Sequence, residues 1–332
     1  MIRTKMKTWP TAGILAGVLL FSAAASPAEE KKEPPAVTSS RALKLSGYTQ
    51  LLYLAQDSGL DGFTLRRARL TLSADLLKNV HFKLQVDAVK TPALMDAQIE
   101  FSFHEAASLR IGQFKVPFSQ ESLTSSGDLD TINRSQPVSK MSPGQDIGAS
   151  GRDIGAVIFG KTSVIGYTVG VFNGAGINKA DTNKEKDWAG RLLVHPAAFL
   201  TLGASLYDGM SSPSAYVPPV KRDRAGVEIA VLHDAFSFKG EFIQAADDEI
   251  IRKGWYLQAG YFFMPKTLQG IFKVDSYDKD TKTDLDRSDL WTLGLNWFLT
   301  EKTKLMINFE LTKDESGKTA NTALLAQFQA AF

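Results

Sequence analysis

Apolar and polar residues alternate one by one along many stretches of the chain. In residues 288–299, one face holds Trp291, Leu293, Leu295, Trp297 and Leu299, and the other holds Thr292, Gly294 and Asn296. A period of two is that of a β-strand, whose successive side chains point to opposite faces. Other stretches place charge on the second face, as at Lys304 and Glu310. A sealed core could not take such groups without paired partners, whereas a water-filled lumen can.

This alternation predicts sixteen strands. They cover residues 43–55, 63–76, 80–90, 94–104, 109–118, 153–160, 164–174, 187–195, 199–208, 222–233, 236–244, 251–263, 268–278, 289–299, 303–313 and 321–332. The connections alternate between tight turns and generally longer, more polar loops, which is typical of an outer-membrane barrel with short periplasmic turns. The expected fold class is therefore all-β, a sixteen-stranded antiparallel transmembrane β-barrel over residues 43–332.

Both ends of the chain indicate the bacterial outer membrane. A segment with three basic residues precedes an apolar run at residues 12–21 and then small residues, so we predict a secretory signal peptide over residues 1–25, with cleavage after Ala25 or Ala28. Residues 26–42 are charged and Pro-rich, which favours a flexible periplasmic lead-in. The last strand ends in Phe332, as expected of a barrel in that membrane. No later stretch holds the ~20 apolar residues of a spanning helix, so any crossing must use strands.

Composition and motifs exclude several kinds of site. Three of the 38 Lys and Arg residues lie in the signal, so the rest of the chain carries 35 against 36 Asp and Glu, without the basic excess of a nucleic-acid binder. There is no cysteine, and the four histidines stand in no catalytic motif. No Gly-rich phosphate loop opens a helix, and the acidic segment 278–286 does not match a calcium loop. We expect no enzyme, no cofactor and no metal.

The most specific stretch runs from residue 63 to residue 160. It contains Phe63-Thr-Leu-Arg-Arg-Ala-Arg-Leu-Thr-Leu72, Phe82-Lys-Leu-Gln-Val-Asp87, Asp96-Ala-Gln-Ile99, Leu109-Arg-Ile-Gly-Gln-Phe-Lys-Val-Pro-Phe118, Glu121-Ser-Leu-Thr-Ser-Ser126 and Arg152-Asp-Ile-Gly155. This order of elements resembles the phosphate-selective porin O and P family of outer-membrane channels. The resemblance implies a sixteen-stranded barrel in a Gram-negative outer membrane, usually a homotrimer, with a long third outer loop folded into the lumen.

The resemblance also implies a porin, a water-filled channel through which small hydrophilic solutes, anions such as phosphate among them, diffuse passively. Residues 119–152 lie between the fifth and sixth strands, where the third loop is expected. A loop this long without regular structure is more often functional than not, so we expect an inward constriction rather than a solvated surface loop. Two other classes of function stay open: a barrel-anchored enzyme, and a plugged barrel with a structural or adhesive role.

Basic residues on the second strand and in this loop are the candidates for lining the pore and binding anions: Arg67, Arg69, Lys83, Arg134, Lys140 and Arg152. A guanidinium presents a planar fork that suits phosphate oxygens. Two interpretations remain open for Arg67 and Arg69, because they either face passing anions or pair with lumen carboxylates on neighbouring strands. The carboxylates in reach are Asp87, Asp96 and Glu100.

The expected lumen is nearly neutral. Its inward basic positions are Arg67, Arg69, Lys83, Arg191, Arg222, Arg224, Lys239, Arg252, Lys273 and Lys304, ten in all. Its inward acids are Asp87, Asp96, Glu100, Asp187, Glu228, Glu241, Asp275 and Glu310, eight in all. A difference of two is too small to select anions by itself, so selectivity is expected to depend on where the charges lie relative to the constriction.

Overall fold

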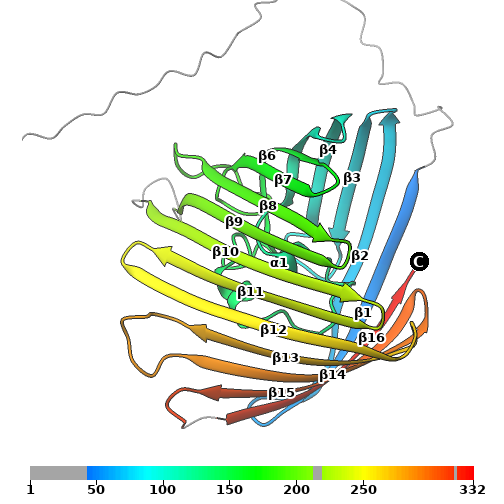
Figure 1. Ribbon diagram of the computed structural model, residues 1–332, viewed down its shortest axis with the longest axis vertical. Helices are drawn as coiled ribbons and strands as arrows, with labels where there is room; N and C mark the ends of the chain where they lie inside the picture. The colour runs from blue at the N-terminus through cyan, green and yellow to red at the C-terminus, as the bar shows by residue number, and fades with distance from the viewer. Residues whose placement is uncertain (1–42, 212–218, 318–319) are drawn as a thin grey trace, which may run out of the picture. The chain divides into compact units, whose positions relative to one another are not determined.

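Sixteen strands close into one antiparallel barrel in the computed structural model, which describes residues 43–211, 219–317 and 320–332 (Figure 1). The strands are β1 (Lys44–Gln56), β2 (Gly62–Leu77), β3 (Val80–Asp87), β4 (Leu94–His104), β5 (Ala107–Lys115), β6 (Arg152–Lys161), β7 (Ile165–Phe172), β8 (Asp187–Ala197), β9 (Leu200–Ser211), β10 (Val220–His233), β11 (Phe236–Asp247), β12 (Ile250–Met264), β13 (Leu268–Asp278), β14 (Ser288–Thr300), β15 (Thr303–Asp314) and β16 (Ala320–Ala331). Each pairs with its neighbours in the chain, and β1 closes against β16. The predicted fold class is confirmed. The predicted signal peptide and the lead-in up to residue 42 lie outside the described residues.

The connections differ between the two ends of the barrel. At one end, tight turns such as residues 78–79 and 301–302 join the strands. At the other end the connections are generally longer, and residues 116–151 form the longest of them. One outer connection is shorter than predicted: residues 245–250 were expected to be a loop, but β11 and β12 leave only Asp248 and Glu249 between them. Asp248 has a φ of 55°, the left-handed conformation that a tight hairpin turn requires.

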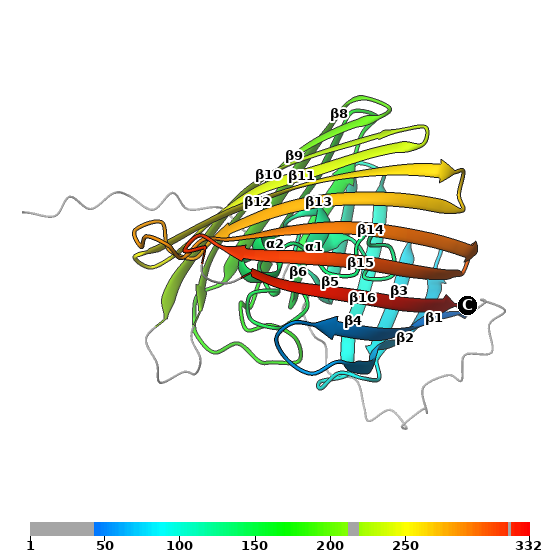
Figure 2. The ribbon, with the colours of Figure 1, turned by 90° about the horizontal axis from the view of Figure 1, so that it is seen from below.

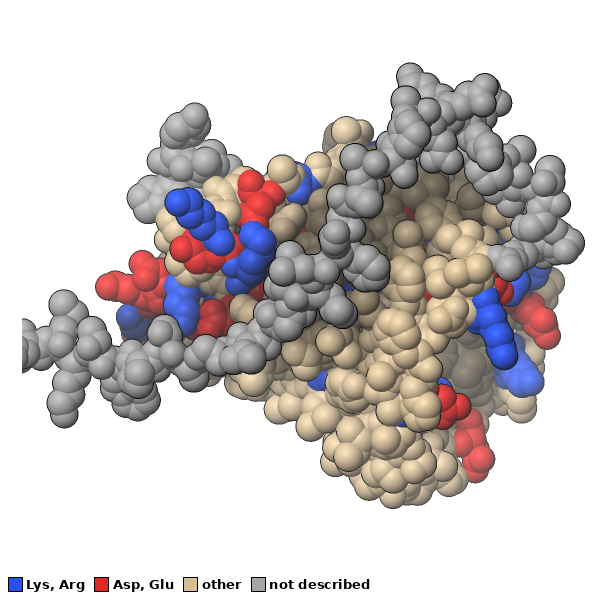
Figure 3. Space-filling view, turned by 90° about the horizontal axis from the view of Figure 1, so that it is seen from above, with Lys and Arg blue, Asp and Glu red and all other residues tan. Residues whose placement is uncertain are grey.

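The outside of the barrel is apolar, as a lipid-facing wall must be. On β14, Leu295 is 42% and Trp297 is 48% exposed, whereas Asn296 between them is fully buried and points inward. One face of the molecule, seen in Figure 3, carries most of its visible Lys, Arg, Asp and Glu towards two ends, with mainly other residues between. Within the described residues, no helix has the length and apolar character needed to cross a membrane.

The two ends of the barrel chain meet beside one another at the short-turn end (Figure 2). The backbone N–H of Phe332 donates to the carbonyl oxygen of Gly47 at 3.0 Å, which extends the β1–β16 pairing to the last residue. A side chain at Gly47 would have its Cβ only 2.5 Å from the carbonyl oxygen of Arg69 and 2.8 Å from the Phe332 ring. Glycine at this position therefore makes room for the terminal ring.

The interior is not uniformly wet. Apolar residues of the 116–151 segment, among them Phe118, Val138 and Met141, form a buried cluster with inward residues of the wall such as Ile243 and Tyr256. Inward apolar residues would be poor lining for an aqueous channel, but here the segment covers them. The alternation of apolar and polar residues did not predict this layer. It indicates which face of the strand a side chain lies on, but it does not indicate what packs against that face.

Candidate functional site: the lumen constriction

The 116–151 segment lies inside the barrel, as Figures 1 and 2 show by the position of its two short helices. The helices are α1 (Gln120–Leu123) and α2 (Gln136–Met141). Ser119, with a φ of 66°, caps α1 by accepting a hydrogen bond from the Ser122 N–H at 3.1 Å. The inward position predicted for the third outer loop is therefore confirmed, and the segment is called the inner loop below.

The inner loop is fixed to the wall formed by β10–β15. The Gln120 side-chain amide donates to the carbonyl oxygens of Ile229 and Gly240, both at 3.0 Å. Further along the loop, the Ile132 N–H donates to the Asn308 side-chain oxygen at 2.6 Å. These contacts join residues more than a hundred positions apart in the chain. They hold the loop against one half of the barrel.

Acids of the inner loop meet cations of the same half. Glu121 forms an ion pair with Lys273 on β13, and both side chains are buried. Asp130 forms a second pair with Lys239 on β11, with 2.6 Å between the oxygen and Nζ. A buried charge is tolerated when it has an opposite partner, so these pairs suit a closed contact between loop and wall. They leave Glu121 and Asp130 unavailable to the other half of the lumen.

The opposite half of the lumen is open and basic. A cavity of about 270 Å³ lies between the inner loop, represented by Leu123 and Ser125, and the wall of β2–β6. Its charged lining residues are Arg69, Lys83, Arg110, Lys115, Arg152 and Asp96. The cavity is thus lined by five cations and one carboxylate, and two of the cations, Arg69 and Arg110, also pair with Asp87 and Glu100 outside the lining. We call it the basic cavity.

The comparisons with known proteins agree with this architecture. The family model for phosphate-selective porins O and P matches residues 48–218 and 214–332, which together span most of the chain. The chain belongs to the phosphate-selective porin O and P family. It is thus a porin, a channel protein of the bacterial outer membrane. No curated protein sequence matches it significantly.

Solved structures confirm the fold of the porin. The anion-selective porin from Comamonas acidovorans is 15% identical, with a TM-score of 0.71 over 88% of this chain and 100% of that one. A loop-deletion variant of the outer-membrane protein OmpT of Vibrio cholerae is 8% identical, with a TM-score of 0.66 over 89% and 100%. OmpF of Salmonella typhi, in complex with daunomycin, is 8% identical, with a TM-score of 0.65 over 87% and 97%.

Three of the six candidate residues of the porin pair with carboxylates. Arg69 donates to Asp87 at 3.0 Å, and both side chains are buried. Lys83 and Arg152 share Asp96, at 2.8 and 2.6 Å. Of the two interpretations left open for Arg69, pairing with a lumen carboxylate therefore describes its contacts, and facing passing anions does not. Lys83 nevertheless keeps 39% of its side chain exposed in the basic cavity.

The other three candidates have no carboxylate partner among the described residues. Arg67 donates to the Gln50 side-chain oxygen at 2.7 Å, while its Nε finds no acceptor there. Arg134 donates to the carbonyl oxygens of Glu121 at 3.0 Å and Thr124 at 2.7 Å. Burial lowers the pKa of Arg134, although the nearby Glu121 carboxylate opposes that change. Lys140 is exposed at the end of α2 and is not part of the basic cavity lining.

Arg66 points into the lumen, as does its chain neighbour Arg67, which simple alternation along a strand does not allow. The Arg66 guanidinium donates to Asn133 of the inner loop at 2.7 Å and to Gln327 on β16 at 3.3 Å. The register of β1 and β2 shifts between Gln50 and Leu51, where Arg67 faces Gln50 and Leu65 faces Leu51. The extra residue on β2 is a β-bulge, which breaks the two-residue period locally. Simple alternation could not reveal it.

Two more cations of the basic cavity escaped the sequence analysis. Arg110 donates to Glu100 at 2.9 Å and lies over the Phe159 ring, 4.7 Å from its centroid. Its position between Leu109 and Ile111 in an alternating stretch was an available signal. Lys115 donates to three carbonyl oxygens at the end of α1, those of Ser122, Leu123 and Thr124, at 2.7, 3.0 and 2.7 Å. No sequence pattern indicates that contact.

Proposed function

We propose that the porin conducts small hydrophilic anions, phosphate among them, by passive diffusion through the basic cavity. The cavity carries the proposal because its lining is positive although the lumen as a whole is nearly neutral. The inner loop seals the β10–β15 half with apolar contacts and ion pairs, so solutes pass the β2–β6 half. Fixed positive charge in a narrow, partly desolvated passage lowers the barrier for anions and raises it for cations.

The inner loop sets the size limit in this proposal. Leu123 and Ser125 bound the cavity on the loop side, and the 270 Å³ between them and the wall suits a small solute. Lys83 supplies an exposed donor in the cavity, and Arg67, outside the cavity lining, supplies an incompletely satisfied one. Arg69 and Arg152 act mainly as paired framework charges. The cysteine-free chain and the histidines supply no catalytic constellation for this site, and a channel needs none.

Assembly belongs to the same proposal. The outer wall is apolar and the expected environment is lipid. One of the similar structures, OmpT of Vibrio cholerae, is described as a trimer form, with a TM-score of 0.61 and 10% identity. We propose that three copies of this porin also associate, each with its own channel. Cross-linking in the membrane followed by electrophoresis should reveal a band at three times the mass of one chain. The full chain has a mass of 36.3 kDa, and removal of the predicted signal peptide would lower it.

The test of the proposed function is ion selectivity. Purified porin in a planar bilayer under a KCl gradient should give a reversal potential displaced towards the equilibrium potential of chloride. Replacing chloride by phosphate on one side should leave a measurable anion current. A reversal potential displaced towards the equilibrium potential of potassium would contradict the proposal. An absence of any conductance would favour a plugged barrel.

A further inference from the structure

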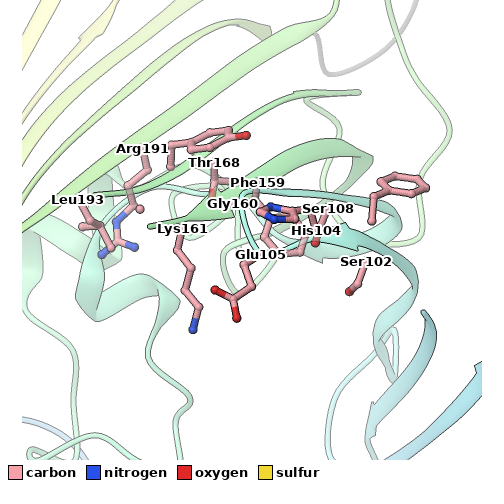
Figure 4. A pocket seen from close by; sticks show the side chains of 13 residues that line it. Ser102, His104, Glu105, Ser108, Phe159, Gly160, Lys161, Thr168, Arg191 and Leu193 are labelled. Atoms are coloured by element: carbon pink, nitrogen blue, oxygen red, sulfur yellow. The ribbon is translucent and has the colours of Figure 1, made fainter. Parts of the chain in front are cut away.

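A second cavity lies on the inner wall at the short-turn end of the barrel (Figure 4). Its volume is about 510 Å³, within the range of small-molecule sites. It is lined by Glu105, by Lys161 at the end of β6, and by residues of β4, β5, β7 and β8. Its lining includes the side chains of Ser102, Ser108, Phe159, Lys161, Thr168 and Leu193. We call this cavity the aromatic recess.

The apolar lining of the recess is unusual for the inside of this barrel. Elsewhere inside, apolar residues are covered by the inner loop, as Ile243 and Tyr256 are. Phe159 only packs against the edge of that cluster, and with Leu193 it lines open space. Gly166 on β7 adds no side chain there: a Cβ at this glycine would have nothing closer than Leu193 at 3.7 Å. A flat apolar floor of this kind suits a ring and not a hydrated inorganic ion.

Polar groups surround this floor. The hydroxyls of Ser102, Ser108 and Thr168 make no hydrogen bond with described residues, so they are free to contact a solute. Figure 4 shows Lys161 and Glu105 extending to the same side of the wall. Neither charged group has an ion-pair partner among the described residues. The recess itself is therefore close to neutral, and it supplies hydroxyl and apolar contacts more than charge.

Arg191 does not change that balance. Its guanidinium forms a two-point ion pair with Glu228 on β10, with Nε 3.1 Å from one carboxylate oxygen. The pair reaches across β9 because Gly203 has no side chain: a Cβ there would lie 2.6 Å from Glu228. Arg191 thus contributes the apolar part of its side chain to the lining, while its charge is already compensated.

Arg110 joins the recess to the basic cavity. It lines the basic cavity, and the same guanidinium lies 4.7 Å from the centre of the Phe159 ring. A second ring, Phe114, lies 5.6 Å away on the basic-cavity side. A solute can therefore place an anionic group among the cations and an attached ring over Phe159. Of the two cavities, the basic cavity supplies most of the cations, and the aromatic recess supplies the larger open space.

We propose that the two cavities form one bipartite site for ring-bearing organic anions, in which the basic cavity holds the anionic group and the aromatic recess holds the ring. This inference rests on the proposed anion channel and adds the class of solute. A solute that fills both cavities must be larger than free phosphate. A phosphate monoester that carries a six-membered ring is an example. Contact of one ring with an aromatic side chain changes binding by about tenfold or more.

The experiment measures chloride current through the porin in a planar bilayer while phenyl phosphate or inorganic phosphate is added. Phenyl phosphate should halve the current at about one-tenth of the concentration needed for inorganic phosphate. Gly166→Leu fills the recess without touching the basic cavity and should abolish this difference. Gly190→Leu is the matched control on β8, because Gly190 also has open space, with only Val169 at 3.9 Å, and this variant should keep the difference.

Two results would overturn the bipartite site: equal potency of the two phosphates in the parent, or an unchanged potency ratio in Gly166→Leu. If Gly166→Leu does not insert, Phe159→Leu removes the aromatic face and keeps an apolar side chain, with the same expected loss. Failure of the proposed function has a different signature, since the channel would then prefer potassium and neither phosphate would reduce its current. An anion-selective channel with equal potencies would reject only the recess.

Discussion

Individual residues of the lumen separate into framework charges and exposed charges. Arg69 and Asp87 are both buried and satisfy one another, so they hold β2 to β3. Lys83 is different, because its partner Asp96 is also held by Arg152 and its own side chain stays partly exposed. Arg67 has no acidic partner among the described residues. In the proposed channel, exposed or unpaired cations act on passing ions, and paired ones act mainly on the wall.

The double variant Arg67→Gln, Lys83→Gln should therefore lose anion preference. One charge at about 4 Å in a wet lumen is worth about 1 kcal/mol, so the anion-to-cation permeability ratio should fall by roughly two- to tenfold at 0.1 M salt. The change should shrink at 1 M, where the Debye length is ~3 Å. Lys140→Gln removes a cation that lies outside the basic cavity and should leave the ratio unchanged. Equal effects of the two variants would contradict the assignment.

Lipid contact is also a property of single positions. Leu295 is exposed on the outer face of β14, and Arg at mid-depth of a lipid-facing wall costs ~2–4 kcal/mol. Leu295→Arg should thus reduce the amount of folded barrel, measured by the fraction with heat-modifiable mobility on gels. Leu295→Met keeps an apolar side chain of similar volume and should fold as the parent does. Normal folding of Leu295→Arg would place this residue away from lipid.

At the scale of elements, the strands and the inward position of the long third loop were predictable, and the contacts of that loop were not. The alternation of apolar and polar residues in β14 and β15 predicts that each segment is a strand. It also predicts which of its residues face the lumen, because successive side chains point to opposite faces. The inner loop has no such period, and its position depends on partners far along the chain, as between Ile132 and Asn308. Its short helices, its apolar layer and the bulge beside Arg66 all come from tertiary contacts that no local pattern encodes.

Glu121 is the strongest link between the inner loop and the wall. Its carboxylate accepts hydrogen bonds from the Ser135 N–H at 2.9 Å and hydroxyl at 2.7 Å and pairs with Lys273, while its N–H donates to Glu241 at 2.8 Å. Glu121→Gln leaves the Lys273 charge uncompensated in a buried place, and losing one partner of a buried pair costs about 3–5 kcal/mol. The loop should then move, so single-channel conductance should rise and become noisier.

Glu105→Gln is the control for this prediction, since Glu105 is exposed at a short turn and has no ion-pair partner among the described residues. It removes the same charge without releasing the loop. Recordings from the two variants at the same voltage should differ clearly in current noise. A quiet Glu121→Gln channel with parental conductance would show that the remaining contacts, such as those of Gln120, hold the loop alone.

At the scale of the whole molecule, closure depends on the last residue. Phe332 exchanges backbone hydrogen bonds with Gly47, at 3.0 and 3.4 Å, and its ring lies over that glycine. Phe332→Ser should reduce the folded porin recovered from the membrane, because the ring contact at the barrel seam is lost. Phe328→Ser on the same strand, also exposed on its outer side, controls for the loss of one outward aromatic. Equal recovery of both variants would remove any special role for the terminus.

The barrel is also divided into two unequal halves. The inner loop packs on β10–β15 and is also bonded to Gln50, Arg66 and Lys115 of β1, β2 and β5, and the basic cavity lies between the loop and β2–β6. Counting inward charges along the whole lumen misjudged their placement, because it omitted Arg110 and Lys115 of the basic cavity and counted Lys239, which Asp130 of the inner loop neutralises. In the proposed channel, selectivity depends on the half next to β2–β6, and the sequence does not show which half stays open.

The central claim is that solutes cross the half next to β2–β6, and cysteine accessibility tests it most directly. The natural chain contains no cysteine, so single cysteines can be placed in an unreactive background. Gln98 lines the basic cavity, whereas Gln269 on β13 is 4% exposed and bonded to Asn296. An anionic methanethiosulfonate reagent should reduce the conductance of Gln98→Cys, faster than its cationic analogue, and leave Gln269→Cys unaffected. Rapid block at residue 269 with none at residue 98 would contradict the account.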